Sequence, residues 1–367
     1  MNSIQSDIWR GGEKWMVNAA SGLAGKGHQV TCIGKIDAVW LEKAARRGLK
    51  VISLPIHADF DPFIIWKLYW LFKKEKIDLI CCNFEKDVRL GGIAAKIAGV
   101  PCIYVRKGLS LIYEKLRYKL AYLHIVDRII TPAYFIKQNF RQFSWLNQDN
   151  IDVIHNGVEI PDTMVFSKEK LRTITGIAAE SQIILGAGNL HPQKGFQYLI
   201  EALKILHQSG KKPHLVITGG GDETPYRAIS ESCGITEYVH FTGHRDDVRE
   251  LMFGADVFVL SSIDEGLPNV VLEAMSVGTP VVAALAGGTD EIVNDGIDGF
   301  TVPVKDSLKI AEKTGVLLDD ENLRAKFGTA GLNRVKKNFT MEVMVDSLNE
   351  IFVNSVSENM KNKTGSL

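Results

Sequence analysis

The 367-residue sequence has no excess of charge of either sign, because 43 basic residues balance 43 acidic ones. Domains that bind nucleic acid usually have a net basic surface, so this balance argues against nucleic acid as a partner. No apolar run approaches the roughly 18 residues that a membrane-spanning helix needs, and the opening stretch MNSIQSDIWRGG lacks the apolar segment of a signal peptide. We therefore expect a soluble, cytoplasmic protein whose only membrane contact would be peripheral, at the inner face of the membrane.

Clusters of metal-binding or dinucleotide-binding residues are also missing. The five cysteines show no C-x-x-C spacing, and His191, His240 and His244 are scattered through the second half. We therefore expect free, mostly buried thiols and no metal cofactor. There is no G-x-G-x-x-G, Walker or H-E-x-x-H motif, and TGGGDE at 218–223 is only a weak glycine signal. A dinucleotide-dependent oxidoreductase is accordingly a distant alternative.

Short runs rich in β-branched residues alternate with helical patterns along the whole chain. Near-continuous apolar strands separated by helices predict parallel sheets that are covered on both faces. The fold class that follows is α/β, with two doubly wound Rossmann-like domains and a ligand cleft between them. We place strands at 28–34, 49–56, 77–83, 101–107, 127–133, 151–157, 182–189, 214–221, 238–244, 255–262, 280–286 and 299–304.

The domain boundary is predicted where the pattern restarts after the polar stretch EIPDTMVFSKEKLR. The expected order is a first Rossmann-like domain, a second Rossmann-like domain, a helix that packs back on the first domain, and a polar tail. NSIQSDIW, at the start, is too polar for a buried central strand, so the first strand is expected to be atypical, or the natural sequence starts upstream of Met1. The predicted segments are 1–160, 161–340, 341–357 and 358–367.

The first of three informative loops follows the strand predicted at 182–189 and reads GNLHPQKGF. The strand is predicted to end at Gly188 and a helix to begin near Gly195, which would place Lys194 at a helix N-terminus. The N–H groups and partial positive charge of a helix start attract an anion, and an ammonium adds a point charge that suits phosphate. The alternative is a solvated loop lysine.

The second loop, IDEGLPN, precedes a helix that is predicted to start at about Pro268–Asn269, since proline suits the first helical position. The N–H groups of residues 269–271 would then face a ligand. Glu273, one turn into the helix, could accept hydrogen bonds from a vicinal diol such as that of a ribose. Glu265 could contact another part of the same ligand. Either glutamate alone could equally be a capping or solvated residue near the helix dipole.

The third loop follows the strand predicted at 280–286. Gly287 and Gly288 would let a ligand approach the backbone closely, and Thr289 is predicted to cap the next helix. Three helix starts that converge on one cleft suit a diphosphate with a sugar at each end.

Taken together, these motifs resemble the retaining GT-B glycosyltransferases of family 4. The resemblance rests on E-x7-E at Glu265 and Glu273 within EGLPNVVLEAMSVGTPVV, followed by GGTDEIVNDGIDGF, and on GNLHPQKGFQYLIEAL, ITGGGDE and FTGHRDDV upstream. IHNGVE looks like the family's interdomain segment, and RGGEKWMVNAASGLAGKGHQV looks like its first loop and helix. The resemblance covers nearly the whole chain.

The resemblance implies a nucleotide-diphosphate-sugar donor as co-substrate, no metal cofactor, and an acceptor held mostly by the N-terminal half. Glu265 and Lys194 would be the catalytic residues, at the donor sugar and the diphosphate, and Glu273 would hold the ribose hydroxyls. The donor would also contact Gly11, Gly12, Gly188, Asn189, His244, Arg245, Gly266, Leu267, Pro268, Asn269, Val270, Val271, Gly287 and Gly288.

Two positions depart from the family's pattern. Asn189 stands where the family usually has a phosphate-binding arginine, which removes a cation from the leaving-group site; Arg245 is a candidate replacement. VRKG stands where the family often has a histidine near the reaction centre. Its Arg106 and Lys107 either bind an anionic acceptor or the donor phosphates, or are merely exposed at a strand end.

Two segments, 62–76 (PFIIWKLYWLFKKEK) and 113–125 (YEKLRYKLAYLHI), mix aromatic and basic residues. Such segments can lie on an anionic membrane surface. At helical spacing, however, aromatic residues belong more often to a protein core, and we prefer that interpretation here.

The sequence thus predicts a retaining glycosyltransferase that moves a sugar from a nucleotide-sugar donor to a hydroxyl of a glycan or lipid-linked acceptor, in polysaccharide or envelope glycan biosynthesis. Two alternatives stay open at this point. One is a catalytically impaired nucleotide-sugar-binding protein, to which Asn189 and the absent strand point. The other is a sugar-nucleotide epimerase of the same fold.

Overall fold

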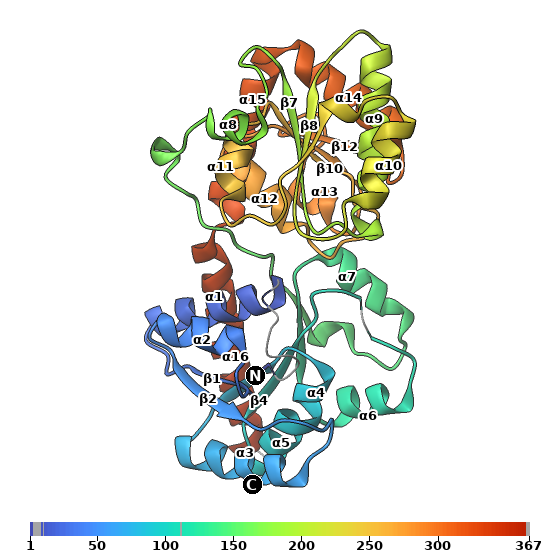
Figure 1. Ribbon diagram of the computed structural model, residues 1–367. Helices are drawn as coiled ribbons and strands as arrows, with labels where there is room; N and C mark the ends of the chain where they lie inside the picture. The colour runs from blue at the N-terminus through green and yellow to red at the C-terminus, as the bar shows by residue number, and fades with distance from the viewer. Residues whose placement is uncertain (3–8, 10, 111, 365–367) are drawn as a thin grey trace. The chain divides into compact units, whose positions relative to one another are not determined.

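The computed structural model describes residues 1–2, 9, 11–110 and 112–364. The chain divides into two compact units, and we treat each by itself (Figure 1). Unit 1 comprises Met1–Gly157 and Met341–Leu367, and unit 2 comprises Val158–Thr340. Both are built on parallel sheets, which confirms the predicted α/β class with two doubly wound domains.

The described residues of unit 1 contain a four-stranded parallel sheet of order β3-β4-β5-β6 and a two-stranded parallel sheet, β1-β2. Every residue of β4 is buried, as expected of a parallel strand covered on both faces, and β1 and β5 are mostly buried, whereas β2 is largely exposed. Their bounds are β1 (Thr31–Lys35), β2 (Lys50–Leu54), β3 (Leu79–Cys82), β4 (Cys102–Arg106), β5 (Arg128–Thr131) and β6 (Ile151–Val153).

The first two residues of the chain connect the two sheets of unit 1. The amino group of Met1 donates to the Cys81 carbonyl at 2.7 Å, and the Asn2 N–H donates to the Ile33 carbonyl at 3.0 Å. Met1 and Asn2 therefore lie between β1 and β3, where a doubly wound sheet has its first strand. No strand precedes the first helix among the described residues, and the rest of NSIQSDIW up to Ile8 lies outside them.

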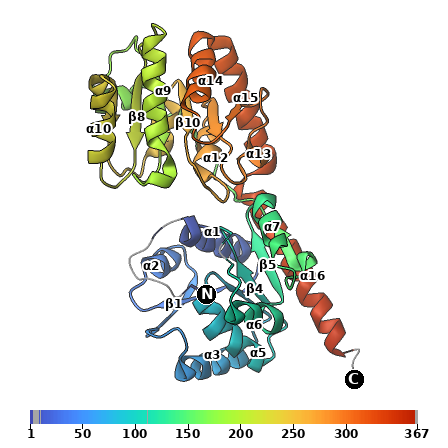
Figure 2. The ribbon, with the colours of Figure 1, turned by 90° about the vertical axis from the view of Figure 1, so that its right-hand side faces the viewer.

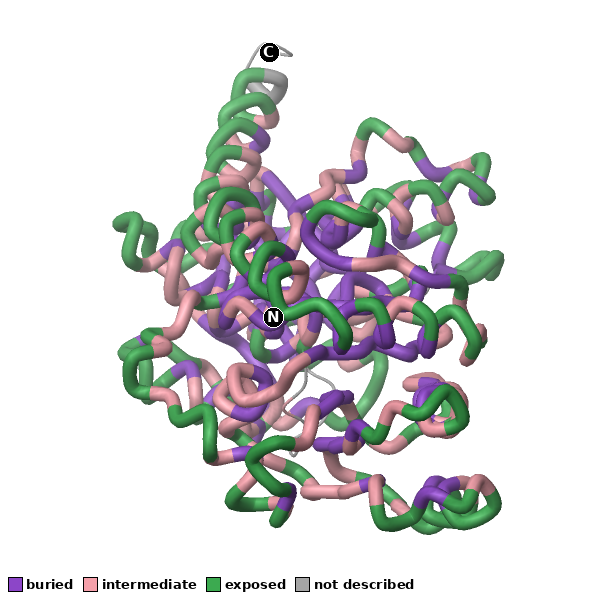
Figure 3. The backbone as a smooth tube through the Cα atoms, turned by 90° about the horizontal axis from the view of Figure 1, so that it is seen from above, coloured by how far each residue is buried: buried purple, intermediate pink, exposed green. Residues whose placement is uncertain are grey.

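Helices cover the sheets of unit 1, and one of them comes from the far end of the sequence. Residues Met344, Val345 and Leu348 of that helix, α16, share a buried cluster with Trp15 and Tyr104. Figure 2 shows α16 running alongside the sheet of this unit. The helices are α1 (Gly11–Gly25), α2 (Val39–Arg46), α3 (Pro62–Glu75), α4 (Glu85–Asp87), α5 (Ile93–Ala98), α6 (Leu116–His124), α7 (Tyr134–Asn139) and α16 (Met341–Thr364). The last helix thus continues well past the end predicted from the sequence, and Figure 3 shows exposed positions along its final turns.

Unit 2 contains a six-stranded parallel sheet of order β12-β11-β10-β7-β8-β9. Every residue of the central strands β7, β10 and β11 is buried, which explains their near-continuous apolar sequences. The strand bounds are β7 (Ile183–Ala187), β8 (His214–Thr218), β9 (Val239–Phe241), β10 (Val257–Leu260), β11 (Val281–Ala284) and β12 (Phe300–Val302).

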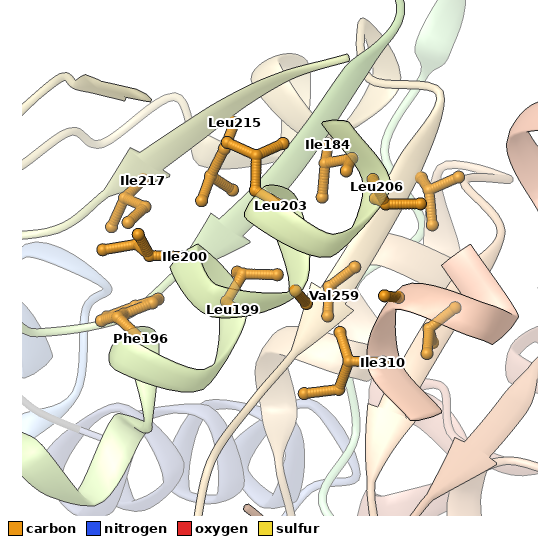
Figure 4. Close-up of a cluster of buried hydrophobic side chains, with 14 of the residues drawn as sticks. Ile184, Phe196, Leu199, Ile200, Leu203, Leu206, Leu215, Ile217, Val259 and Ile310 are labelled. Carbon is orange, nitrogen blue, oxygen red and sulfur yellow. The ribbon is translucent and has the colours of Figure 1, made fainter. Parts of the chain in front are cut away.

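The core of unit 2 forms where α9 packs on its sheet. The buried residues Phe196, Leu199, Ile200, Leu203 and Leu206 follow helical spacing and contact apolar side chains of the strands (Figure 4). The helices of unit 2 are α8 (Lys170–Thr175), α9 (Phe196–Gln208), α10 (Thr224–Ser232), α11 (Val248–Phe253), α12 (Asn269–Ser276), α13 (Thr289–Ile292), α14 (Ser307–Asp319) and α15 (Glu321–Asn338).

We preferred a core position for the aromatic residues of α3, and this prediction is wrong for three of them. Phe63, Trp66 and Trp70 are 58%, 56% and 55% exposed and lie on one face of the helix, because their spacing is three and four residues. The opposite face buries Ile64 and Leu68. No helix in the described part of the chain has the length and apolar content of a membrane span.

The cysteines agree with the expectation of free thiols. All five are unbridged, and Cys32, Cys82 and Cys102 are buried. Burial raises the pKa of Cys102 to about 12, so this thiol is protonated at neutral pH.

Candidate functional site

Four neighbouring strands of unit 2, in the order β11-β10-β7-β8, end at the same edge of the sheet. In open parallel sheets this carboxyl edge is where ligands bind. The loops that follow β7, β10 and β11 are the three that the sequence singled out, so the strand order places them next to one another.

The loops after β7 and β10 are joined by hydrogen bonds. Ser261 Oγ donates to the Lys194 carbonyl at 3.0 Å, and Gln193 Nε2 donates to the Asp264 carbonyl at 2.8 Å. A Cβ atom on Gly195, whose φ is +64°, would lie 2.1 Å from the Ser261 carbonyl oxygen. Only glycine permits this close approach, which fixes the position of Lys194 relative to the second loop.

Lys194 and Glu265, 71 residues apart, form the central ion pair of the edge, with 2.6 Å between Nζ and Oε1. Ser262 Oγ donates to the same oxygen at 2.7 Å. The hydrogen bonds that Glu265 accepts from the described residues therefore both go to Oε1. The two side chains are 24% and 13% exposed, so the pair is partly shielded from water but remains accessible.

The helix α9 begins at Phe196 with Gly195 as its cap residue, close to the predicted start near Gly195. Lys194 directly precedes the cap and ends a 3₁₀ turn, Pro192–Lys194. The aliphatic part of its side chain crosses Gly188, where a Cβ would lie 3.4 Å from Lys194 Cδ. The small residue at the end of β7 thus leaves room for the lysine to reach Glu265.

The loop after β11 packs against the loop that carries Glu265. The Gly288 N–H donates to the Gly266 carbonyl at 2.9 Å. A Cβ on Gly287, with φ +62°, would lie 2.0 Å from the Glu265 carbonyl oxygen. The prediction that Thr289 caps the next helix is wrong: Gly288 occupies the cap position, and Thr289 is the first residue of the four-residue helix α13, with Oγ1 donating to Ala286 at 2.7 Å.

The helix α12 begins at Asn269, within the predicted start, and Pro268 is its cap residue instead of its first helical residue. Leu267 beside it is buried. The Val271 N–H donates to the Pro268 carbonyl at 3.0 Å, so this N–H is already satisfied within the first turn. Val270 and Asn269 are half-buried at the helix start, and Glu273, also half-buried, lies one turn further along.

Arg245, the candidate replacement for the arginine that is absent at position 189, is paired with an acidic side chain. Its guanidinium donates two hydrogen bonds to Asp247, both at 2.7 Å, and Lys170 also binds this carboxylate. These hydrogen bonds hold the pKa of Asp247 far below its usual range, so the pair stays ionised. Asn189 and His244 are exposed. The His244 Nε2 atom lies 3.8 Å from the Asp246 carboxylate.

The remaining candidates, Gly11, Gly12, Arg106 and Lys107, belong to unit 1. Gly11 and Gly12 begin α1, and Arg106 ends β4. Arg106 and Lys107 are each only 6% exposed. The possibility that they are merely exposed at a strand end is therefore wrong.

Sequence reasoning missed three polar residues that build this edge: Gln193, Ser261 and Ser262. Their only sequence signal is their place at the end of the predicted strand and in the QKG turn. The partners of Gln193 and Ser261 lie about 70 residues away, whereas Ser262 binds Glu265 three residues further on. Within the described residues, no group of three or more histidine, cysteine, aspartate or glutamate side chains is arranged as a metal site.

Two family models match the chain. The model "Glycosyl transferases group 1" matches residues 167–334, and the model "Glycosyltransferase Family 4" matches residues 9–160. The matched ranges contain the three loops of unit 2 and the candidate residues of unit 1.

Relatives and solved structures agree with these matches. The UDP-Gal:alpha-D-GlcNAc-diphosphoundecaprenol alpha-1,3-galactosyltransferase of Escherichia coli is 28% identical over 314 residues, covering 79% of this chain and 78% of that protein. The N,N'-diacetylbacillosaminyl-diphospho-undecaprenol alpha-1,3-N-acetylgalactosaminyltransferase of Campylobacter jejuni is 28% identical over 315 residues, covering 78% and 81%.

The similarity to solved structures extends over both units. A glycosyltransferase from Rickettsia africae has a TM-score of 0.84 at 20% identity, with 97% of this chain and 98% of that chain covered. HepE from Anabaena in complex with UDP has a TM-score of 0.82 at 22% identity, with 96% and 99% covered. At these identities the likeness establishes the fold.

Proposed function

Because the chain belongs to the group 1 and family 4 glycosyltransferases, we propose that it transfers a sugar from a nucleoside-diphosphate-sugar to a hydroxyl of a sugar carried on a lipid diphosphate, with retention of the anomeric configuration. The observation that carries the proposal is the Lys194–Glu265 pair at the carboxyl edge of the unit 2 sheet. The names of the relatives support the acceptor class, since both act on sugars linked to diphosphoundecaprenol.

In this proposal, unit 2 binds the donor. Lys194 and the start of α12 hold the diphosphate, helped by the glycine loop at Gly287, and Glu273 accepts hydrogen bonds from the ribose hydroxyls. A charge-assisted hydrogen bond contributes about 1.5–3 kcal/mol. The helix start adds partial positive charge at the same place. The charge of the departing nucleoside diphosphate is thus offset in part by this chain's own groups, with the Lys194 ammonium shared between Glu265 and the phosphate oxygens.

Glu265 has two tasks in the proposed reaction. Its Oε1 positions the Lys194 ammonium, and its Oε2 receives a hydroxyl of the donor sugar. The bond between C1 of the sugar and the phosphate oxygen breaks, and the acceptor hydroxyl forms the new bond to C1 from the same face. The hydroxyl proton passes to the departing phosphate oxygen, so the product retains the anomeric configuration.

A transfer assay with the full-length protein tests this proposal. UDP-, GDP- and ADP-sugars are offered with a sugar on a short-chain prenyl diphosphate, in buffer containing EDTA, and the product's anomeric configuration is read by NMR. A new glycosidic bond with retained configuration is expected. An epimerised donor, or tight donor binding without turnover across the acceptors, would instead favour one of the two alternative functions.

We also propose that unit 1 docks on an anionic membrane surface through α3. Phe63, Trp66 and Trp70 form an exposed aromatic face, and Lys67 and Lys73 lie on the same helix. Aromatic rings suit the interfacial region of a bilayer, and lysines are attracted to anionic headgroups. This face would bring the enzyme to a lipid-linked acceptor.

Sedimentation with vesicles of phosphatidylethanolamine and phosphatidylglycerol tests the membrane proposal. The double variant Trp66→Ser/Trp70→Ser is expected to lower vesicle affinity by about tenfold, because two buried rings are lost from the interface. The matched control is Leu308→Ser, which removes a side chain that is 68% exposed on unit 2. Equal vesicle affinity of the wild type and the double variant would contradict the proposal.

A further inference from the structure

Unit 1 contains a cavity of about 360 Å³ at the edge of its sheet where β5 and β6 begin. Its volume lies within the range of about 300–1000 Å³ that is typical of small-molecule sites. Arg106, at the end of β4, belongs to the opposite edge of the same parallel sheet. The cavity is therefore separate from the strand ends considered above. Polar and aromatic residues line it, among them Arg128, Trp145, Asn147, Asn150, Glu358 and Asn359.

The end of α16 forms one wall of this cavity. Ser355 Oγ and the Tyr104 hydroxyl lie 2.8 Å apart in the core, and Asn359 Nδ2 donates to the Pro101 carbonyl at 3.0 Å. Both contacts are with β4 or with the residue directly before it, so they hold the helix against this edge of the sheet. Glu358 and Asn359 lie beyond the helix end predicted at residue 357. The unpredicted extension of α16 thus supplies part of the cavity wall.

The charges closest to the strand starts are paired within the protein. Arg128 donates from Nε and Nη2 to the Asp152 carboxylate at 2.8 and 2.6 Å. Lys96 Nζ lies 3.5 Å from the Asp127 carboxylate. A cation that is already paired attracts a phosphate weakly, because its partner carboxylate repels the incoming charge. These ion pairs therefore favour an uncharged ligand.

Hydrogen-bonding groups that the protein itself does not use remain at the cavity wall. Among the described residues, the side chains of Asn150 and Glu358 have no hydrogen-bond partner, and Nη1 of Arg128 donates to none. An amide both donates and accepts, a guanidinium N–H donates, and a carboxylate accepts. A hydroxyl group is also both donor and acceptor. The set therefore matches a ligand that carries several hydroxyls.

Trp145 adds an apolar surface beside these polar groups. Its Nε1 donates to the Glu114 carboxylate at 3.1 Å. Its ring centroid lies 5.5 Å from that of Phe143 and 6.3 Å from that of Tyr122. A ring held in this way offers contact area with little further loss of side-chain entropy on binding. The C–H groups on one face of a sugar ring are apolar and suit such a surface.

We propose that this cavity binds an uncharged sugar unit. Trp145 packs against the C–H face of the sugar, while Asn150, Glu358 and Nη1 of Arg128 form hydrogen bonds with its hydroxyls. The site goes beyond the proposed transfer reaction, because it lies at the other edge of the unit 1 sheet and in a different unit from the Lys194–Glu265 pair. Such a unit is carried either by a free sugar or by a glycan chain.

Saturation-transfer NMR with the full-length protein tests this proposal. The probes are the methyl glycosides of glucose, galactose and N-acetylglucosamine, and saturating UDP, GDP and ADP are present to occupy a donor site. At least one glycoside is expected to bind the wild type. Asn150→Ala and Glu358→Gln are each expected to weaken its binding roughly three- to tenfold, because each removes or weakens one hydrogen bond. Glu350→Gln, the same change at an exposed position of α16, is the control and should bind like the wild type.

A charged probe separates a binding role of Glu358 from a structural one. The methyl uronide that corresponds to the bound glycoside has a carboxylate in place of the C6 hydroxymethyl group. Glu358 repels this carboxylate, so the wild type should bind the uronide several-fold more weakly than the glycoside. Glu358→Gln should reduce the difference. An equal change in the affinities for both probes would overturn the role given to Glu358.

A tetrasaccharide of the same sugar identifies the source of the ligand. Tighter binding of the tetrasaccharide than of the glycoside supports a glycan chain, and equal binding supports a free sugar.

Three results would overturn the sugar site: no saturation transfer to any glycoside from the wild type, equal affinity of the wild type and both cavity variants, or tighter binding of the uronide, which would make this an anion site. Failure of the transfer assay is a separate result and leaves the sugar binding unchanged.

Discussion

Gly287 shows how single residues position the proposed donor site. Its φ of +62° suits glycine, and the Glu265 carbonyl oxygen occupies the space where a side chain would begin. The glycines of this loop were visible in the sequence as places of close backbone approach. The sequence did not show which backbone atoms these glycines approach. The partner loop follows a different strand, which is a neighbour in the sheet but is separate along the chain. The same holds for the Lys194–Glu265 ion pair.

The first prediction concerns Gly287→Ala. A Cβ at this position would lie 2.0 Å from a backbone oxygen, so the loop must shift and carry Glu265 with it. We expect a loss of free energy of unfolding greater than the roughly 1 kcal/mol that positive φ alone costs an alanine, together with weaker UDP binding. Denaturant unfolding and calorimetry measure the two effects.

The matched control is Gly296→Ala, where φ is +73° and no atom lies within 4 Å of the added Cβ. This variant should show the cost of positive φ and bind UDP normally. Equal losses in the two variants, with normal UDP binding in both, would show that the contact of Gly287 with Glu265 has no functional consequence.

At the scale of elements, the strands were predictable and the surroundings of the helices were not. Each observed strand lies within or beside a predicted apolar run, because a strand buried on both faces needs apolar residues throughout. The aromatic residues of α3 have helical spacing whether they face the core or the surface, so the pattern could not separate the two. The end of α16 at Thr364 was also not predicted, because the last turns of this helix are polar.

The second prediction concerns the contact of α1 with α16. A Cβ on Gly22 would lie 2.2 Å from Val345 Cγ2, so Gly22→Ala overpacks this contact and should lower the free energy of unfolding by roughly 1–3 kcal/mol. The double variant Gly22→Ala/Val345→Ala should be more stable than the sum of the single changes predicts, because the smaller side chain makes room. Thermal and denaturant unfolding provide the measurement.

Gly25→Ala is the control in the same helix, since no atom lies within 4 Å of the added Cβ. It should be neutral or slightly stabilising. If Gly22→Ala behaves like Gly25→Ala, then α16 does not pack against α1 as described.

At the scale of the whole molecule, two α/β units share one chain, and the C-terminal helix belongs to the first unit. The sequence indicated two domains because the strand–helix pattern restarts after a polar stretch. The three loops of unit 2 were also readable, since each follows an apolar strand and contains glycine or proline. The order of the strands, and therefore which loops meet, depends on long-range pairing that no local pattern encodes.

Binding of a nucleoside diphosphate to the full-length protein tests the central claim most directly, namely that the Lys194–Glu265 edge of unit 2 holds the diphosphate of a sugar donor. Calorimetry compares UDP, GDP and ADP on the wild type, on Lys194→Met, and on Lys212→Met, which removes an exposed lysine elsewhere in unit 2. The account predicts that the wild type and Lys212→Met bind one of these nucleotides equally, and that Lys194→Met binds it roughly tenfold to a hundredfold more weakly. Equal affinity of all three proteins for that nucleotide, or no binding of any nucleoside diphosphate to the wild type, would contradict it.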